Sequence, residues 1–263
     1  MITRITAGKL EVECFVHIFE SCTQNSFAVA SIIENLLAKI KREYPQVDSA
    51  FFRSDNAGCY HSGALLLSLH DIGKRTGITP LRYDFSDPQS GKDICYRKTA
   101  PMKSHIRRWV NEKNDVLTAL GMNTALESHG GLKGCRIAVV KIDPVAENAS
   151  PPNKIPGISL LNNFAFTKNG IRVWRAYNVG LGKVLWYKDL NVQTQQDTKL
   201  GPYQVLKFKE QKYSPAMKSP AFLLSSHLKR LRPTWTLANT SKQVNMNLCM
   251  TQPKRCGQKE LQK

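Results

Sequence analysis

Two groups of acidic residues have the types and spacing from which a metal-dependent site can be built. Asp55 stands in "SDNAG", which follows the apolar run "AFF" and Arg53. The second group is "YDFSDPQSGKD", which contains Asp84, Asp87 and Asp93. Mg²⁺ prefers oxygen ligands, and two such ions about 4 Å apart can catalyse phosphoryl transfer. Each group also has a plainer interpretation, because Asp commonly opens turns and caps helices.

The elements that would position these acids follow the alternation of an α/β protein. The apolar pattern predicts strands over residues 11–19, 47–53, 78–85 and 135–142, and helices over 25–42, 63–75, 91–112 and 115–128. Gly77 is expected to end its helix in a left-handed turn, and Pro101 is expected to kink another. Strands that alternate with helices favour a sheet with crossover connections, whose strand ends are where sites are built. Asp55 is therefore expected at the rim of a central sheet.

The chain divides into three parts by composition. Residues 1–145 hold the α/β pattern, and residues 146–195 read as a Pro-rich linker followed by a β-rich extension with a hairpin turn at Asn169-Gly170. Residues 196–263 are interpreted as a loose basic tail of low complexity.

The charge balance points to a polyanionic partner. The chain carries 38 Lys and Arg against 20 Asp and Glu, a formal net charge of +18. Such an excess favours nucleic acid, although a solvated basic surface is the alternative. No apolar run is long enough for a membrane helix and no signal pattern opens the chain. The seven cysteines, at scattered spacings, do not suggest a secreted disulfide framework.

The two acidic groups together resemble a known family. "SDNAGCYHS" followed by "DFSDPQSGKDICYRK" is similar to the ribonuclease-H-like catalytic core of DDE transposases and retroviral-type integrases. It resembles more closely the transposon-derived proteins of animal genomes that carry "SDNAGCYHS…DFSxPQxGKxxCDRK". The resemblance covers roughly residues 11–190. It implies a mixed sheet with flanking helices, in which Asp55 matches the second catalytic acid and Mg²⁺ is the cofactor of an active enzyme.

The chain departs from that pattern in two places. By resemblance, strand 11–19 is the third strand, so the first two strands and the first acid are expected to be missing before Glu11. Tyr96 stands where the pattern has Asp. Asp93 is the first candidate for a substitute acid, and with Asp55 a metal ligand, while Asp87 is the second candidate. The missing strands would leave a sheet edge uncovered, where a partner or a second copy could bind.

Basic residues next to this motif are the candidates for nucleic-acid contacts. The predicted phosphate-binding residues are Lys92, Arg97, Lys98, Lys103, Arg107 and Arg108. Cations and aromatics also mix at Arg172, Trp174, Arg175 and Tyr177, and such groups suit binding that does not depend on sequence. The alternative is that Trp109 and Trp174 are core residues with Arg outside. DNA is favoured over RNA, and "HLKRLRP" favours a nuclear location, with the cytoplasm as the alternative.

A zinc site is disfavoured, because Cys14 and His17 should point to opposite faces of a strand while Cys59 and His61 lie in a turn. The leading hypothesis is a transposon-derived nucleic-acid-binding protein with a degenerate DDE-type phosphodiester site. Two alternatives remain open. The chain is an active Mg²⁺-dependent nuclease or transposase when N-terminal strands complete it, or it is a relic without function.

Overall fold

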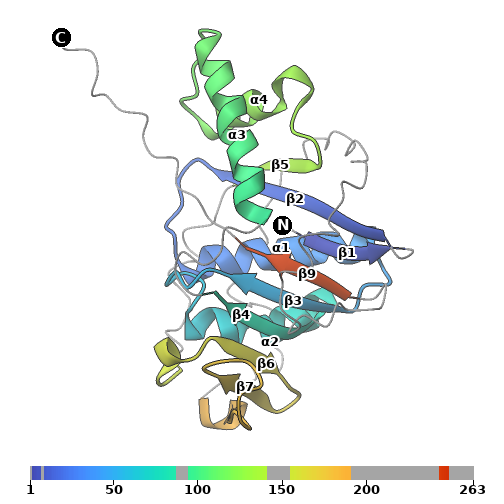
Figure 1. The fold of residues 1–263 in the computed structure, drawn as a ribbon, viewed down its shortest axis with the longest axis vertical. Helices are drawn as coiled ribbons and strands as arrows, with labels where there is room; N and C mark the ends of the chain where they lie inside the picture. The colour runs from blue at the N-terminus through green and yellow to red at the C-terminus, as the bar shows by residue number, and fades with distance from the viewer. Residues whose placement is uncertain (1, 7–8, 87–93, 141–154, 191–242, 249–263) are drawn as a thin grey trace, which may run out of the picture.

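The computed structural model describes residues 2–6, 9–86, 94–140, 155–190 and 243–248 (Figure 1). The helices are α1 (Ser26–Glu43), α2 (Gly63–Thr76), α3 (Ile94–Asn111) and α4 (Ala119–Glu127). The strands are β1 (Ile2–Thr6), β2 (Lys9–Phe19), β3 (Ser49–Ser54), β4 (Thr79–Phe85), β5 (Cys135–Val140), β6 (Asn163–Phe166), β7 (Gly170–Trp174), β8 (Lys183–Trp186) and β9 (Gln243–Asn247). Short 3₁₀ turns cover Ser128–Gly130, Ile158–Leu160 and Tyr187–Leu190.

The strands form one mixed sheet in the order β5-β2-β1-β9-β3-β4-β6-β7-β8. The pairs β2–β5, β9–β3 and β3–β4 are parallel, and the other neighbours are antiparallel. Helix α2 connects β3 to β4 as a crossover, as the alternation of the sequence predicts. The expectation of an α/β chain with a mixed sheet and flanking helices is confirmed.

Two strands were not expected from the sequence. Strand β1 precedes β2 and pairs with it antiparallel, so the expectation that no strand precedes residue 11 is wrong. Its sequence, "ITRIT", is rich in the β-branched residues that favour strands. Strand β9 comes from the region interpreted as a loose tail, and it lies between β1 and β3. Strands β1 and β9 thus lie between β2 and β3, so the expected gap of missing strands is filled there.

The helices begin and end where side-chain chemistry favours it. Asn25 caps α1 by accepting a hydrogen bond from the Ala28 N–H at 2.9 Å. Ser62 caps α2 through the Leu65 N–H at 3.2 Å. Gly77 ends α2 with φ of 69°, the left-handed conformation that glycine adopts without a steric penalty. These termini agree closely with the predicted ones.

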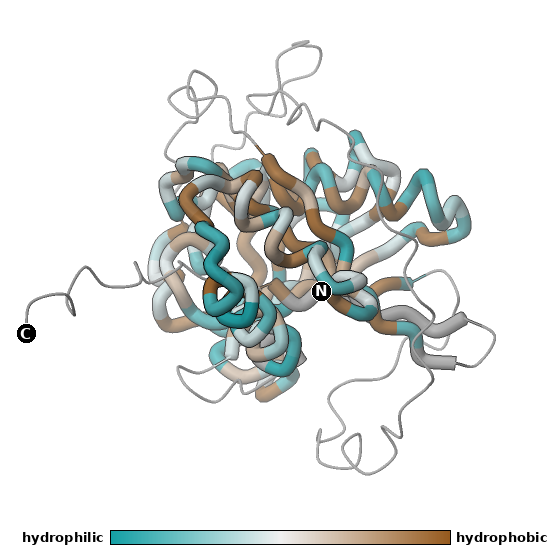
Figure 2. Tube along the Cα trace, turned by 90° about the horizontal axis from the view of Figure 1, so that it is seen from above, coloured by the Kyte–Doolittle hydropathy of each residue, from teal (hydrophilic) through white to brown (hydrophobic). Residues whose placement is uncertain are grey.

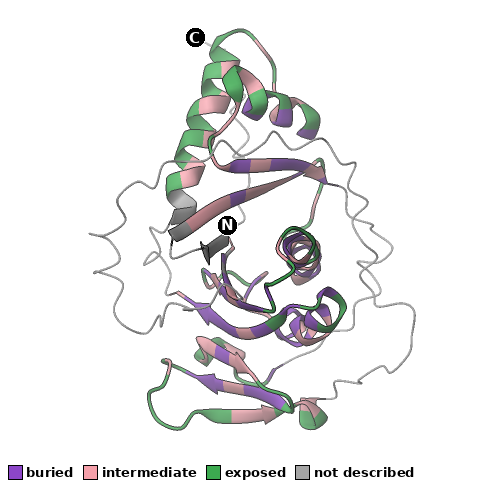
Figure 3. Ribbon diagram, turned by 90° about the vertical axis from the view of Figure 1, so that its right-hand side faces the viewer, coloured by how far each residue is buried: buried purple, intermediate pink, exposed green. Residues whose placement is uncertain are grey.

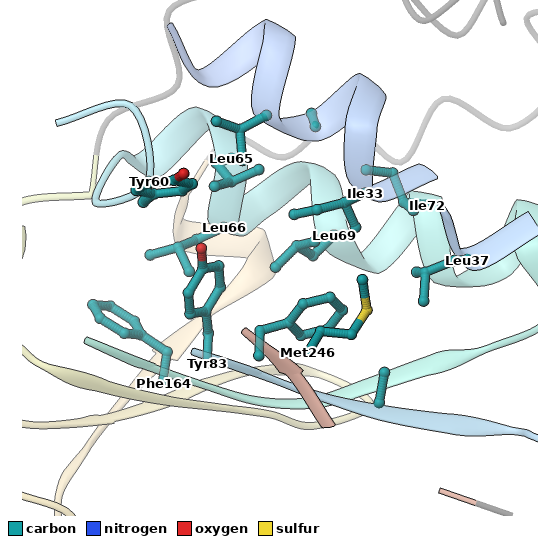
Figure 4. Close-up of a cluster of buried hydrophobic side chains, with 14 of the residues drawn as sticks. Ile33, Leu37, Tyr60, Leu65, Leu66, Leu69, Ile72, Tyr83, Phe164 and Met246 are labelled. Atoms are coloured by element: carbon teal, nitrogen blue, oxygen red, sulfur yellow. The ribbon is translucent and has the colours of Figure 1, made fainter. Parts of the chain in front are cut away.

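Helices α1 and α2 cover one face of the sheet and bury the main core beneath them (Figure 4). The apolar stripe of α1, which includes Ile33, Leu36 and Leu37, is buried in this core. Alternate residues of β3 and β4, such as Phe52 and Tyr83, point into this core from below. Burial is concentrated between these helices and the strands (Figure 3). Hydrophobic and hydrophilic residues alternate within the turns of the helices, as expected for amphipathic helices with one apolar face (Figure 2).

Helices α3 and α4 pack on the opposite face at the β2–β5 end of the sheet (Figure 1). Val16 and Ile18 of β2 contact a smaller cluster that includes Ile106 of α3 and Leu126 of α4. Phe15, which points the other way on the same strand, packs against the main core. Strand β2 thus carries helices on both of its faces. The helix predicted over 115–128 is shorter than expected, because Thr118 caps it at 3.0 Å from the Gly121 N–H.

The predicted hairpin at Asn169-Gly170 is present. The Thr167 N–H donates to the Gly170 carbonyl at 2.9 Å, and β6 and β7 pair on either side of the turn. Strand β6 also pairs with β4, so this extension continues the main sheet. Among the described residues, none of the helices is both long and apolar enough to cross a membrane.

Candidate functional site

The carboxyl ends of three parallel strands, β9, β3 and β4, lie side by side and form the edge of the sheet at which Asp55 lies. The Leu248 N–H, just after β9, donates to the Arg53 carbonyl of β3 at 2.8 Å. On the other side of β3, the Ser54 carbonyl accepts hydrogen bonds from Ser86, from its N–H at 3.0 Å and its hydroxyl at 3.1 Å. These bonds align the ends of β9, β3 and β4. Such an edge is where α/β proteins commonly build their sites.

Asp55 is exposed at this edge and also orders the turn that follows β3. Its Oδ1 accepts a hydrogen bond from the Ala57 N–H at 3.2 Å. The Ser54 hydroxyl donates to the Asp55 carbonyl at 2.9 Å and accepts from the Tyr83 hydroxyl at 3.2 Å. The turn interpretation and the strand-end interpretation of Asp55 are therefore compatible.

The neighbouring strand places a second carboxylate, Asp84, opposite Arg53 in the register. Asp84 is 8% exposed, and both of its oxygens are occupied. The Arg82 Nε donates to Oδ2 at 2.9 Å, and the Asn163 side-chain amide donates to Oδ1 at 2.7 Å. Burial raises the pKa of Asp84, and the Arg82 charge opposes that rise. The Arg82 guanidinium lies 4.0 Å from the centre of the Tyr177 ring, which covers the pair from outside.

The described carboxylates do not fit a Mg²⁺ centre. Asp84 would have to give up an ion pair and an amide hydrogen bond, which leaves Asp55 as the one described carboxylate with an exposed position at this edge. Mg²⁺ needs several converging oxygens, and within the described ranges no three His, Cys, Asp or Glu side chains converge. Asp87 and Asp93 lie outside the described residues, so their predicted roles as substitute acids stay predictions.

Cys59 and His61 lie in the turn after Asp55, as expected. Burial raises the pKa of Cys59, and the negative charge of Asp55 acts in the same direction. The His61 ring packs 4.4 Å from the Phe85 ring and edge-on to Phe164. Burial lowers the pKa of His61. These contacts hold the turn against the core, which is a structural role.

Helix α3 presents four of the six predicted basic residues along an exposed face. It contains five Lys and Arg and no Asp or Glu. Arg97, Lys103, Arg107 and Arg108 are exposed, while Ile106 faces the small cluster on the sheet. Arg108 forms an ion pair with Glu112 at 3.0 Å, whereas no described carboxylate pairs with Lys103 or Arg107. The exposed cations span about 16 Å of helix at 1.5 Å per residue.

Other predicted contacts have different surroundings. Lys98 is half-buried, and its amine donates to the Lys133 carbonyl at 3.1 Å, which ties α3 to the turn before β5. Lys92 lies outside the described residues. Trp174 is 9% exposed, as the core interpretation expects. Trp109 is partly buried, and its indole nitrogen has no hydrogen-bond partner in the described structure.

Comparison of the chain with known protein families, with curated proteins and with solved structures found no match. The site must therefore be judged from its geometry. Sequence reasoning noted Asp84 as part of an acidic cluster but did not connect it with Arg82 and Asn163. The sequence did contain a signal for the pairing of Arg82 with Asp84, because residues two apart on a strand lie on the same face. Asn163 is brought to Asp84 by the pairing of β6 with β4, which the sequence does not specify locally.

Proposed function

We propose that this protein binds nucleic acid through the exposed face of α3, and that it derives from a transposase whose phosphodiester site has degenerated. The observation that carries the proposal is the outward row of Arg97, Lys103, Arg107 and Arg108 on a helix without acidic residues. Phosphates need charge and reach rather than a shaped pocket. A net charge of +18 adds a general attraction to polyanions.

The ribonuclease-H-like origin is supported by the motif and by the directions of the strands. Strands β2, β1 and β9 are neighbours in this order, and each pair is antiparallel. Strand β9 runs parallel to β3, and β3 runs parallel to β4. Asp55 follows the strand that the resemblance assigns to the second acid. The internal ion pair of Asp84 with Arg82 supports a degenerate site over an active one, because this carboxylate is already neutralised within the fold.

Salt-dependent binding tests the proposal. Fluorescence anisotropy should show that the chain binds labelled duplex DNA at least as tightly as a duplex RNA of the same length. The logarithm of the affinity should fall linearly with the logarithm of the salt concentration. Substitution of Asp55 by Ala should leave the affinity unchanged or raise it, because a negative charge is removed. Affinity that does not depend on salt would contradict the proposal.

The nuclease alternative rests on the exposed position of Asp55 at the ends of three parallel strands. It predicts nicking of supercoiled DNA that requires Mg²⁺ and disappears in Asp55→Ala. A matched control is Asp48→Ala, which removes an exposed carboxylate just before β3, at the opposite end of that strand. Nicking that Asp55→Ala abolishes and Asp48→Ala preserves would replace the degenerate-site proposal by the enzymatic one.

A further inference from the structure

Strand β9 has an unusual place in the sheet, because it joins two groups of strands. On one side it pairs with β1, where Ile2 stands opposite Met246. On the other side it pairs with β3, where Ser49 stands opposite Gln243 and Arg53 opposite Asn247. The order of the sheet shows β5, β2 and β1 on one side and β3, β4, β6, β7 and β8 on the other. Strand β9 is the member through which these groups are hydrogen-bonded.

The same strand fills the middle of the main core. Val244 and Met246 are 0% and 1% exposed, and both belong to the cluster beneath α1 and α2. Figure 4 shows Met246 beneath Ile33, Leu37 and Leu69. The space between β1 and β3, here called the β9 slot, thus provides two rows of backbone partners and a floor for two apolar side chains. This is the arrangement by which sheets bind an added strand.

The neighbours of β9 in the sheet are remote from it in the sequence. Residues 191–242 stand between the last described residue of the extension and β9. That length of chain can reach about 170 Å when fully extended, and the cost of closing a long loop rises slowly with its length. No tight turn therefore sets the register of β9. The register is determined by the side chains and backbone groups of the slot itself.

We propose that the β9 slot is a strand-binding site, and that residues 243–248 are its ligand segment, held by the slot without need of their covalent connection. The segment alternates polar and apolar residues, "QVNMNL", which suits a slot with one buried face. Its last contact, from the Leu248 N–H to the Arg53 carbonyl, lies two residues before Asp55. Binding of this segment therefore completes the edge of the sheet on which Asp55 lies.

Cleavage of the folded full-length chain tests the proposal. A recognition sequence for a specific protease is inserted within residues 191–242, and the purified chain is cut under native conditions. The C-terminal fragment should co-elute with the rest of the chain on size exclusion and separate from it in denaturant. Separate elution under native conditions would overturn the proposal, whatever structure the rest of the chain retains.

Peptide exchange on the cut protein measures the selectivity of the β9 slot without a substitution in the residues that form the slot. The cut protein is mixed with a fluorescent peptide of residues 241–248, and anisotropy follows its exchange for the bound fragment. A peptide with Met246→Asp should bind at least tenfold more weakly, since a fully buried side chain becomes charged. The control peptide with Met246→Leu should stay close to the parent, because it conserves volume. Equal affinity of the parent and Met246→Asp peptides would overturn the proposal.

Discussion

The two faces of the sheet are built in different ways. The face under α1 and α2 holds a continuous apolar core that draws on β3, β4, β6, β7 and β9. The opposite face carries the small cluster under α3 and α4 at the β5 end, and the buried pair of Arg82 and Asp84 on β4. The first face supplies most of the burial that stabilises a fold. The second face has room for charge, and the candidate nucleic-acid surface belongs to it.

Substitutions that create a cavity in each cluster test whether the two faces differ in their contribution to stability. Leu69→Ala, in the main core, should lower the free energy of unfolding by about 3–5 kcal/mol. Ile106→Ala in α3 should cost about 1–2 kcal/mol, because Ile106 is partly exposed and its cluster is small. Chemical denaturation of both variants measures the difference. Equal losses would show that the two faces contribute alike.

Removal of the buried carboxylate of Asp84 tests the charged part of the second face. Asp84→Ala should destabilise the protein by about 3 kcal/mol, because it leaves the buried Arg82 without its counter-ion. Urea titration at neutral pH measures this loss. A change below about 0.5 kcal/mol would mean that the Arg82 charge is solvated without Asp84.

Asp84→Asn is the control for charge, and it also has a pH signature. The pKa of Asp84 is raised in the fold, so the folded state holds this proton more strongly than the unfolded state does. Relative to Asp84→Asn, the natural chain should therefore gain stability as the pH falls through the raised pKa toward the ordinary value of 3.8. A relative loss over that range would show that Arg82 outweighs burial.

His17 gives the opposite pH dependence. Burial lowers its pKa from 6.5 to about 4, with the charge of Lys39 acting in the same direction. The unfolded state binds the proton first, so stability is full above pH 6.5 and is lost as the pH falls toward 4. The loss should be about 3 kcal/mol larger than in His17→Gln at pH 4. Parallel pH profiles of the two proteins would contradict this prediction.

Substitutions on α3 should have the smallest effect on stability and a clear effect on binding. The double variant Lys103→Ala/Arg107→Ala should change the free energy of unfolding by less than about 0.5 kcal/mol. Its salt slope for DNA binding should fall by about 1.8, or 0.9 for each lost phosphate contact. The matched control is Lys168→Ala/Lys188→Ala, which removes the same charge from exposed positions on the extension. Equal losses in both variants would mean that net charge alone drives binding.

Much of the fold followed from local patterns. The stripe of apolar residues in α1, the left-handed Gly77 and the hairpin at Asn169-Gly170 are each properties of a few neighbouring residues. The same holds for the exposed cations of α3, since a helix sorts its residues by their spacing. The candidate acid Asp55 could be placed at a strand end because the apolar run before it stops abruptly.

Tertiary structure decided which distant segments meet. The sequence of residues 243–247 has the alternation of a strand, but it stands in a basic region and has no partner nearby in the chain. Its place between β1 and β3 depends on a slot formed by residues more than 180 positions away. The pair of Arg82 and Asp84 likewise became a closed unit only through Asn163 and Tyr177, which the folding of the extension brings to it. Such contacts follow from the burial that the whole chain achieves, and no local pattern encodes them.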